Sequence, residues 1–232
     1  MTLLSNQQMN HSQTSYFRRS VGLIALYDKA NQQFVRRGTC FFLQQGNQRV
    51  LYTAAHLIFR DDVTNQYQHN IDLENNVLLI AFQRSDFNNP DNHGIDWKFW
   101  GMVLDHNENS DRAVIQLCGM MAVHNDAVYF GYNDHLSEFV NFSALPFNSN
   151  IRLETQEHLF LAGFPQVVIP PNQPCTSMMV TLGEALDING GTAQTTNFNL
   201  KGCSGGPLID AQGNVLGLLS RGMDHLSIVS LF

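Results

Sequence analysis

Charged residues are scarce in this chain of 232 residues. They make up 14% of it, against about 25% in a typical globular protein, and the formal net charge is −7. Lysine and arginine cluster only in pairs such as Arg18-Arg19 and Arg36-Arg37, so we expect no nucleic-acid partner. No apolar run approaches the roughly 18–20 residues that span a bilayer, so we expect no membrane partner either.

Signals for targeting and for metal binding are also lacking. The stretch Phe17–Tyr27 faintly resembles a signal peptide, but its apolar run is short, Asp28 follows it, and no small-residue cleavage site is visible. We expect this stretch to contain the first strand instead. No cluster of residues has the spacing of metal ligands, so we expect no metal and no cofactor.

What the chain does have is a succession of short β-prone runs, separated by turns rich in Asn, Gly, Pro and Asp. No long amphipathic helix is evident, and an apolar content of 44% is enough for a substantial core. The expected strands are Val21–Tyr27, Thr39–Leu43, Val50–Thr53, Val77–Phe82, Lys98–Leu104, Ala113–Leu117, His158–Gly163, Ser177–Leu182, Thr192–Phe198, Pro207–Ile209, Val215–Ser220 and Leu226–Leu231. The pattern predicts an all-β protein.

The most informative segment is Gly202-Cys203-Ser204-Gly205-Gly206-Pro207, between two of these runs. Its glycines let the backbone bend where a β-carbon would clash, and its proline fixes φ as the chain enters a strand. Such a turn can expose the hydroxyl of Ser204 to a substrate. Serine is a poor nucleophile, however, until a neighbouring base takes its proton.

Two upstream segments supply a base and an acid. Leu51–His56 is an apolar run that ends in two alanines and a histidine, and Asp111 opens the apolar run Ala113–Leu117. Histidine titrates in the range that a general base needs, and a carboxylate can fix its tautomer. Asp105 is a competing acid, but it lacks the apolar pattern that follows Asp111. The order His56, Asp111, Ser204 is that of chymotrypsin and not of subtilisin or the α/β-hydrolases.

These motifs resemble those of the trypsin/chymotrypsin-like serine peptidases, and Gly38–Phe42 and Leu161–Pro165 add weaker matches. The resemblance implies two six-stranded antiparallel Greek-key barrels, with the active site in the cleft between them. We expect a flexible polar arm over residues 1–15, the first barrel over 16–119, a crossing over 120–150 and the second barrel over 151–232.

The resemblance also implies which residues form the oxyanion hole and the substrate pocket. The backbone N–H groups of Gly202 and Ser204 would form the oxyanion hole. The pocket for the substrate residue before the scissile bond would be lined by six residues, namely Phe198, Asn199, Leu200, Ser220, Arg221 and Gly222. A Phe-lined, uncharged pocket is favoured, although Arg221 could attract acidic groups and Asp224 or His225 could close the pocket.

The cysteines depart from the pattern of secreted members. These carry an aspartate at the position of Cys203, which pairs with a new N-terminal amine after activation, so we expect this chain to need no N-terminal trimming. They also bridge the strand before the histidine to a cysteine just after it, whereas Leu57 follows His56 here and leaves Cys40 without that partner. We expect Cys40, Cys118, Cys175 and Cys203 to be reduced thiols, and the compartment to be the cytoplasm.

The resemblance implies a serine endopeptidase that acts on protein or peptide substrates through His56, Asp111 and Ser204. Cys203 as the nucleophile is disfavoured, because it stands one residue before the position that viral cysteine proteases of this fold use. Two other functions stay open. One is a catalytically silent binding module with the same fold, although such modules usually lose a triad residue. The other is an esterase that uses the same three residues.

Overall fold

The structure is a computed structural model. It describes residues 17, 19–60, 64, 66–67, 75–82, 99–124, 127–132, 143–166, 168–169, 173–174, 178–223 and 226–232. The expected arm over 1–15, together with Cys175, Asp224 and His225, lies outside the described residues. Within the described part, no helix has the length and apolarity needed to cross a membrane.

The first barrel is a closed ring of six strands. They are β1 (Val21–Asp28), β2 (Gln33–Gln45), β3 (Gln48–Ala54), β4 (Asn76–Phe82), β5 (Phe99–Asn107) and β6 (Arg112–His124). Neighbours follow the order β1-β4-β5-β6-β3-β2, and the antiparallel pairing of β1 with β2 closes the ring. Two further strands extend this sheet: β7 (Ala127–Tyr132) pairs with β6, and the short β8 (Leu145–Pro146) runs parallel to β2. The sheet therefore extends beyond residue 119, where the sequence suggested that the first barrel ends.

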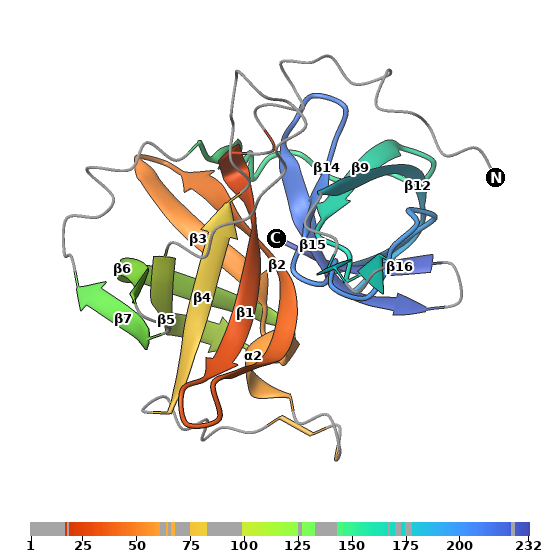
Figure 1. The fold of residues 1–232 in the computed structure, drawn as a ribbon. Coiled ribbons are helices and arrows are strands. Elements are labelled where there is room, and N and C mark those ends of the chain that lie inside the picture. The colour runs from red at the N-terminus through yellow and green to blue at the C-terminus, as the bar shows by residue number, and fades with distance from the viewer. Residues whose placement is uncertain are drawn as a thin grey trace.

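The second barrel is also closed and has six antiparallel strands. They are β9 (His158–Gly163), β12 (Met179–Asn189), β13 (Thr192–Thr195), β14 (Pro207–Ile209), β15 (Val215–Met223) and β16 (Leu226–Leu231). Their order is β12-β13-β16-β15-β14-β9, and β10 (Val168–Ile169) and β11 (Gln173–Pro174) form a separate small hairpin. Figure 1 shows the two barrels side by side, the first in red to green and the second in teal to blue. The expected all-β fold of two barrels is confirmed.

Strand β1 is buried on both faces, which explains why its apolar run does not alternate with polar residues. Ile24 and Leu26 pack in the hydrophobic core of the first barrel. Val21 and Leu23 belong to a different cluster, which also contains residues of the second barrel. The strand thus contributes to the core of the first barrel and to a cluster that contains residues of both barrels.

That second cluster joins the two barrels. It contains Phe41 from β2 of the first barrel together with Ile209 and Leu218 from the second. Ala54, the last residue of β3, is part of the same cluster. The barrels therefore share a hydrophobic seam, and the chain reaches His56 just after it leaves that seam.

Candidate active site

His56 is held at the point where β3 gives way to α2 (His56–Phe59), a single helical turn. The two alanines before it are fully buried, as their small size allows. The Ala55 N–H donates to the Asp111 backbone oxygen at 3.0 Å. On the other side, Arg36 Nη1 donates to the His56 carbonyl at 3.3 Å. The backbone around the histidine is therefore fixed from two neighbouring segments.

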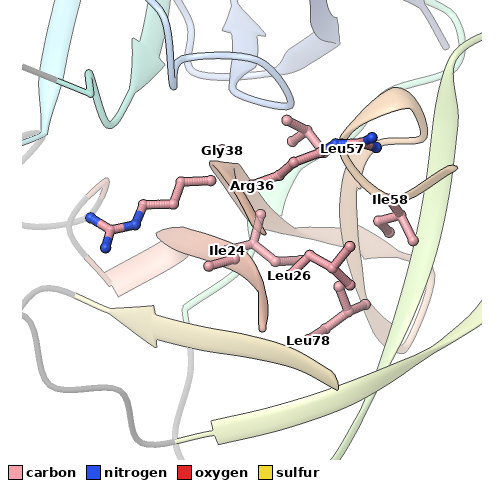
Figure 2. Close-up of a pocket in the computed structure, with 9 residues that line it drawn as sticks. Ile24, Leu26, Arg36, Gly38, Leu57, Ile58 and Leu78 are labelled. Atoms are coloured by element: carbon pink, nitrogen blue, oxygen red, sulfur yellow. The ribbon is translucent and has the colours of Figure 1, made fainter. Parts of the chain in front are cut away.

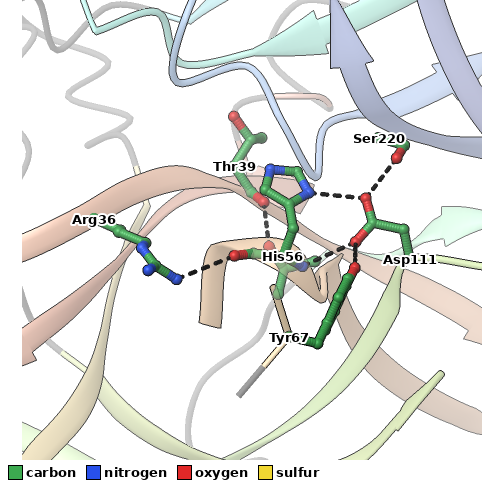
Figure 3. A network of polar contacts seen from close by, with 7 residues as sticks. Arg36, Thr39, His56, Tyr67, Asp111 and Ser220 are labelled. Carbon is green, nitrogen blue, oxygen red and sulfur yellow. Dashed lines mark hydrogen bonds and ion pairs between the residues drawn. The ribbon is translucent and has the colours of Figure 1, made fainter. Parts of the chain in front are cut away.

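Asp111 is the centre of the polar network that Figure 3 shows. Its carboxylate lies against both the main chain and the ring of His56: Oδ1 accepts from His56 N–H at 2.8 Å, and Oδ2 lies 2.8 Å from His56 Nδ1. Tyr67 Oη donates to Oδ1 at 2.8 Å, and Ser220 Oγ donates to Oδ2 at 2.5 Å. Asp111 itself has a positive φ of 47°, a conformation that aspartate tolerates better than most residues. The pairing of His56 with Asp111 expected from the sequence is present in the structure.

The environment keeps this carboxylate ionised. Burial alone would raise the pKa of Asp111, but the hydrogen bond and charge of His56, with the hydroxyls of Ser220 and Tyr67, bring the pKa below its usual value. Burial and the charge of Asp111 raise the pKa of Tyr67, so its hydroxyl stays a donor. Because an ionised carboxylate can only accept, His56 Nδ1 must donate, and this leaves Nε2 able to take a proton.

Ser204 lies in a turn whose backbone conformation requires glycine at two positions. Gly202 has a φ of 96° and Gly205 a φ of 82°, both in the left-handed region. A β-carbon on Gly205 would overlap the Thr39 carbonyl oxygen and lie 2.6 Å from Thr53 Oγ1. The turn of the second barrel therefore packs directly on β2 and β3 of the first.

Thr39 fastens this turn to the first barrel. Its N–H donates to the Ser204 carbonyl at 2.8 Å, and its Oγ1 donates to the Gly202 carbonyl at 3.0 Å. The same Oγ1 accepts from Phe164 N–H at 2.9 Å, and the Thr39 carbonyl accepts from Thr53 Oγ1 at 2.7 Å. Sequence reasoning placed Thr39 on a strand but missed this role, because its partners lie far away along the chain.

The packing also brings Ser204 towards His56. A β-carbon on Gly205, the residue after Ser204, would lie 2.9 Å from the backbone nitrogen of Ala54, two residues before His56. Among the hydrogen bonds of the described residues, none joins Ser204 Oγ to His56 Nε2. Such contacts are often long in the absence of substrate and tighten when it binds.

Two backbone amides in the Ser204 turn differ from that of the residue between them. Among the described residues, no group accepts a hydrogen bond from the N–H of Gly202 or of Ser204. The intervening Cys203 N–H, in contrast, donates to the Leu200 carbonyl at 3.0 Å. Gly202 is buried, and a β-carbon on it would lie 2.6 Å from the Phe164 carbonyl oxygen. This is the pair of donors that the sequence suggested for an oxyanion.

The Cys203 thiol lies in the core of the second barrel, with Leu161 and Leu208 among its cluster. Burial raises its pKa to about 11. A β-carbon on Gly163 would lie 2.9 Å from Cys203 Cβ, so the space around it is closely filled. Cys203 is thus a small core side chain here, and the cysteines that the structure describes, Cys40, Cys118 and Cys203, are all buried free thiols.

The residues assigned to a substrate pocket lie in different settings. Ser220 directs its hydroxyl to Asp111, a contact that sequence reasoning did not foresee. The Phe198 carbonyl accepts from Thr181 Oγ1 at 2.9 Å, and Leu200 packs on the core of the second barrel. Arg221 is exposed on β15. The remaining two residues of the set, Asn199 and Gly222, are in contact with each other.

A shallow crevice lies between β2 and the residues Leu57 and Ile58 of α2, as Figure 2 shows. Its floor is apolar, and Arg36 and Arg37 contribute the charged part of its lining. Leu57 covers Gly38 so closely that a β-carbon there would overlap Leu57 Cδ1. The strand before the histidine and the residue after it are therefore joined by packing. No group of three or more metal-ligating side chains occurs in the part of the chain that the structure describes.

Comparisons with known proteins agree with the two-barrel fold. Residues 38–218 match the family model of the trypsin-like peptidase domain. The serine endoprotease from Yersinia pestis superposes with a TM-score of 0.60 and 14% identity, over 97% of this chain and 64% of that one. The Rv3671c protease from M. tuberculosis in its active form gives a TM-score of 0.61 and 16% identity, over 97% and 82%. This chain thus spans less than two thirds of the length of the Yersinia enzyme. No curated protein matches it in sequence.

Proposed function

Because the chain belongs to the trypsin-like peptidase domain family, we propose that it is a serine endopeptidase whose catalytic residues are His56, Asp111 and Ser204. The observation that supports this most strongly is the Asp111 carboxylate. It holds both the backbone and the ring of His56, and it is itself held by Tyr67 and Ser220. A buried carboxylate with this many donors is suited to orienting a base and to stabilising the imidazolium that forms on it.

In the proposed reaction, Ser204 Oγ attacks the carbonyl carbon of a peptide bond while His56 Nε2 takes the hydroxyl proton. The same nitrogen then gives that proton to the leaving amine, and an acyl-enzyme remains on Ser204. Water repeats the sequence to release the acid. Asp111 stays ionised throughout, as its lowered pKa favours.

The amides of Gly202 and Ser204 would receive the charge that develops on the carbonyl oxygen. A donor of this kind stabilises the transition state by about 3 kcal/mol. The geometry suits that task, because the two N–H groups have no acceptor among the described residues and the Gly202 backbone is held by Thr39. This supports the assignment of the two amides to the oxyanion hole.

Two other functions compete with this proposal. A silent binding module would have no use for an ionised carboxylate fixed against a histidine, and here the acid and the base lie 2.8 Å apart. An esterase would use the same residues and differs only in the leaving group that it accepts. The two enzyme functions must therefore be separated by the choice of substrate.

The test is covalent labelling of the full chain with a small fluorophosphonate, followed by digestion of an unfolded protein such as casein. We expect labelling at Ser204 and cleavage of peptide bonds. Ser204→Ala and His56→Ala should each lower kcat by a factor on the order of 10⁶. Ser143→Ala, at a half-buried serine outside the strands and outside the Ser204 turn, serves as a control that should label like the unmodified chain. Absence of labelling would exclude the enzyme, and labelling with hydrolysis of esters but not of peptides would favour the esterase.

A further inference from the structure

The hydroxyl of Thr39 joins two segments of the second barrel to each other. Its Oγ1 donates to the Gly202 carbonyl at 3.0 Å and accepts from the Phe164 N–H at 2.9 Å. Thr39 is fully buried, so water cannot take over either hydrogen bond. The hydroxyl thus connects the segment that precedes Ser204 with the segment that follows β9.

The same two segments meet again at the peptide bond between Lys201 and Gly202. The Gln166 N–H donates to the Lys201 carbonyl at 2.5 Å. Because the C=O and N–H groups of a planar trans peptide point in opposite directions, this hydrogen bond directs the Gly202 N–H away from Gln166. The direction matters because the Gly202 N–H is one of the two donors proposed for the oxyanion hole.

The turn itself allows that peptide two orientations. The Cys203 N–H donates to the Leu200 carbonyl at 3.0 Å, so residues 200–203 form a β-turn with the Lys201–Gly202 peptide at its centre. The φ of 96° at Gly202 is that of a type II turn, whereas a type I turn keeps the same hydrogen bond with a φ of about −90° at this position. The ψ of the second residue differs by about 150° between the two types, which turns the central peptide over. Glycine adopts both signs of φ readily, so the turn alone does not determine where the Gly202 N–H points.

We infer that Thr39 is a positioning residue whose hydroxyl keeps the Lys201–Gly202 peptide in the type II orientation, in which the Gly202 N–H can donate to an oxyanion. The inference rests on the proposed peptidase function. Only the type II orientation presents the Lys201 carbonyl to the Gln166 N–H. Thr39 Oγ1 holds the two segments together two residues away, through Phe164 on one side and Gly202 on the other.

Thr39→Val removes the hydroxyl and nearly conserves the shape of the side chain. The hydrogen bonds of the Thr39 N–H to the Ser204 carbonyl and of Thr53 Oγ1 to the Thr39 carbonyl involve main-chain atoms of residue 39, so both are retained. The Gly202 carbonyl and the Phe164 N–H, in contrast, would lose their buried partner, which favours a rearrangement of this segment. Thr39→Ser keeps the hydroxyl and should keep the orientation.

The experiment measures the acylation of Ser204 by p-nitrophenyl acetate and by p-nitrophenyl thionoacetate, in which sulfur replaces the carbonyl oxygen. In both reactions Ser204 Oγ bonds to the acyl carbon, p-nitrophenolate leaves, and the hydroxyl proton passes to His56. Sulfur is a weak hydrogen-bond acceptor, so an oxyanion hole accelerates the reaction of the oxygen ester more than that of the thionoester. The ratio of the two rates therefore reports on the oxyanion donors, whereas general damage to the site lowers both rates together.

Thr39→Val should lower the oxygen-to-sulfur rate ratio at least about tenfold, and by about 10²–10³ if the Gly202 donor is lost completely. Thr39→Ser should restore the ratio of the unmodified chain. Thr192→Val is the matched control, because the exposed Thr192 also donates its hydroxyl to a carbonyl, that of Asn189 at 2.8 Å, and its ratio should be unchanged. If Thr39→Val fails to fold, Thr39→Cys retains a weak donor and acceptor and should give an intermediate ratio.

The outcomes separate this inference from the proposed function. If a fluorophosphonate labels Ser204 in the unmodified chain, but the folded Thr39 variants keep its rate ratio or lose both rates in equal proportion, Thr39 does not orient the peptide and the peptidase proposal stands. If neither the fluorophosphonate nor the ester reacts with Ser204 in the unmodified chain, both are wrong.

Discussion

Replacing Tyr67 with phenylalanine tests whether the Asp111 network works as an electrostatic unit. Tyr67 Oη donates to Asp111 Oδ1 at 2.8 Å, and the Tyr67 ring packs against the core of the first barrel. Tyr67→Phe therefore removes the donor and leaves the packing. Asp111 keeps its hydrogen bonds to His56 and Ser220.

A hydrogen bond to a charged group contributes roughly 1.5–3 kcal/mol. Tyr67 is only partly buried, so water can replace some of the lost contact. We expect Tyr67→Phe to lower the free energy of unfolding at pH 7 by about 1–2 kcal/mol. For a protein of this size that corresponds to a fall in Tm of about 2–8 °C.

The loss of stability expected for Tyr67→Phe depends on pH. The pKa of Asp111 is lowered in the folded chain, so the carboxylate adds stability above the pKa of the unfolded state, about 3.9. That stability is lost as the pH falls through the lower folded pKa. Tyr67→Phe should move the folded pKa of Asp111 upward. The difference in the free energy of unfolding between variant and parent is therefore largest at pH 7 and becomes smaller below about pH 4.

The assay is urea unfolding followed by intrinsic fluorescence at a series of pH values from 7 to 3. Tyr52→Phe is the matched control, because Tyr52 Oη accepts from the neutral Gln45 Nε2 at 3.0 Å. It should lose about 0.5–1.5 kcal/mol at every pH. A loss for Tyr67→Phe that is the same at pH 7 and pH 3 would refute the reasoning, because Tyr67 would then contribute packing alone.

Two further predictions concern the Ser204 turn. Gly205→Ala should lower the free energy of unfolding by well over 1 kcal/mol and abolish fluorophosphonate labelling, because its β-carbon would overlap Thr39; Gly213→Ala has a similar φ of 94° but nothing within 4 Å, so it should retain labelling. Because Cys203 supplies no charge for an N-terminal amine, the 232-residue chain should label without trimming. Labelling that appeared only in chains shortened to begin at Ser20 or Val21 would contradict this.

Three strands begin and end where the sequence predicted. β9, β14 and β16 have the expected bounds, His158–Gly163, Pro207–Ile209 and Leu226–Leu231. β2 was expected over Thr39–Leu43 but extends over Gln33–Gln45, because its polar ends gain hydrogen bonds from β1 and β3 that no local pattern reveals. Strand ends here are decided by neighbouring strands.

The residues of the candidate site, too, were only partly predictable from the sequence. Sequence motifs singled out His56 and Asp111, which the structure brings into contact. They could not reveal Tyr67, which lies 44 residues from Asp111 in a segment without a motif. The contact of Ser220 with Asp111 likewise depends on how the two barrels dock, since the two residues are 109 positions apart.

The seam between the barrels has a consequence for how activity is lost. Thr39 of the first barrel holds the carbonyls of Ser204 and Gly202, and Ser220 of the second barrel holds Asp111. Each half of the proposed catalytic site is thus kept in place by the other barrel. A small separation at the seam would break these contacts of the Ser204 turn and of Asp111, while both barrels kept their strands. Hydrolysis should therefore disappear at lower urea concentrations than the circular dichroism of the sheets.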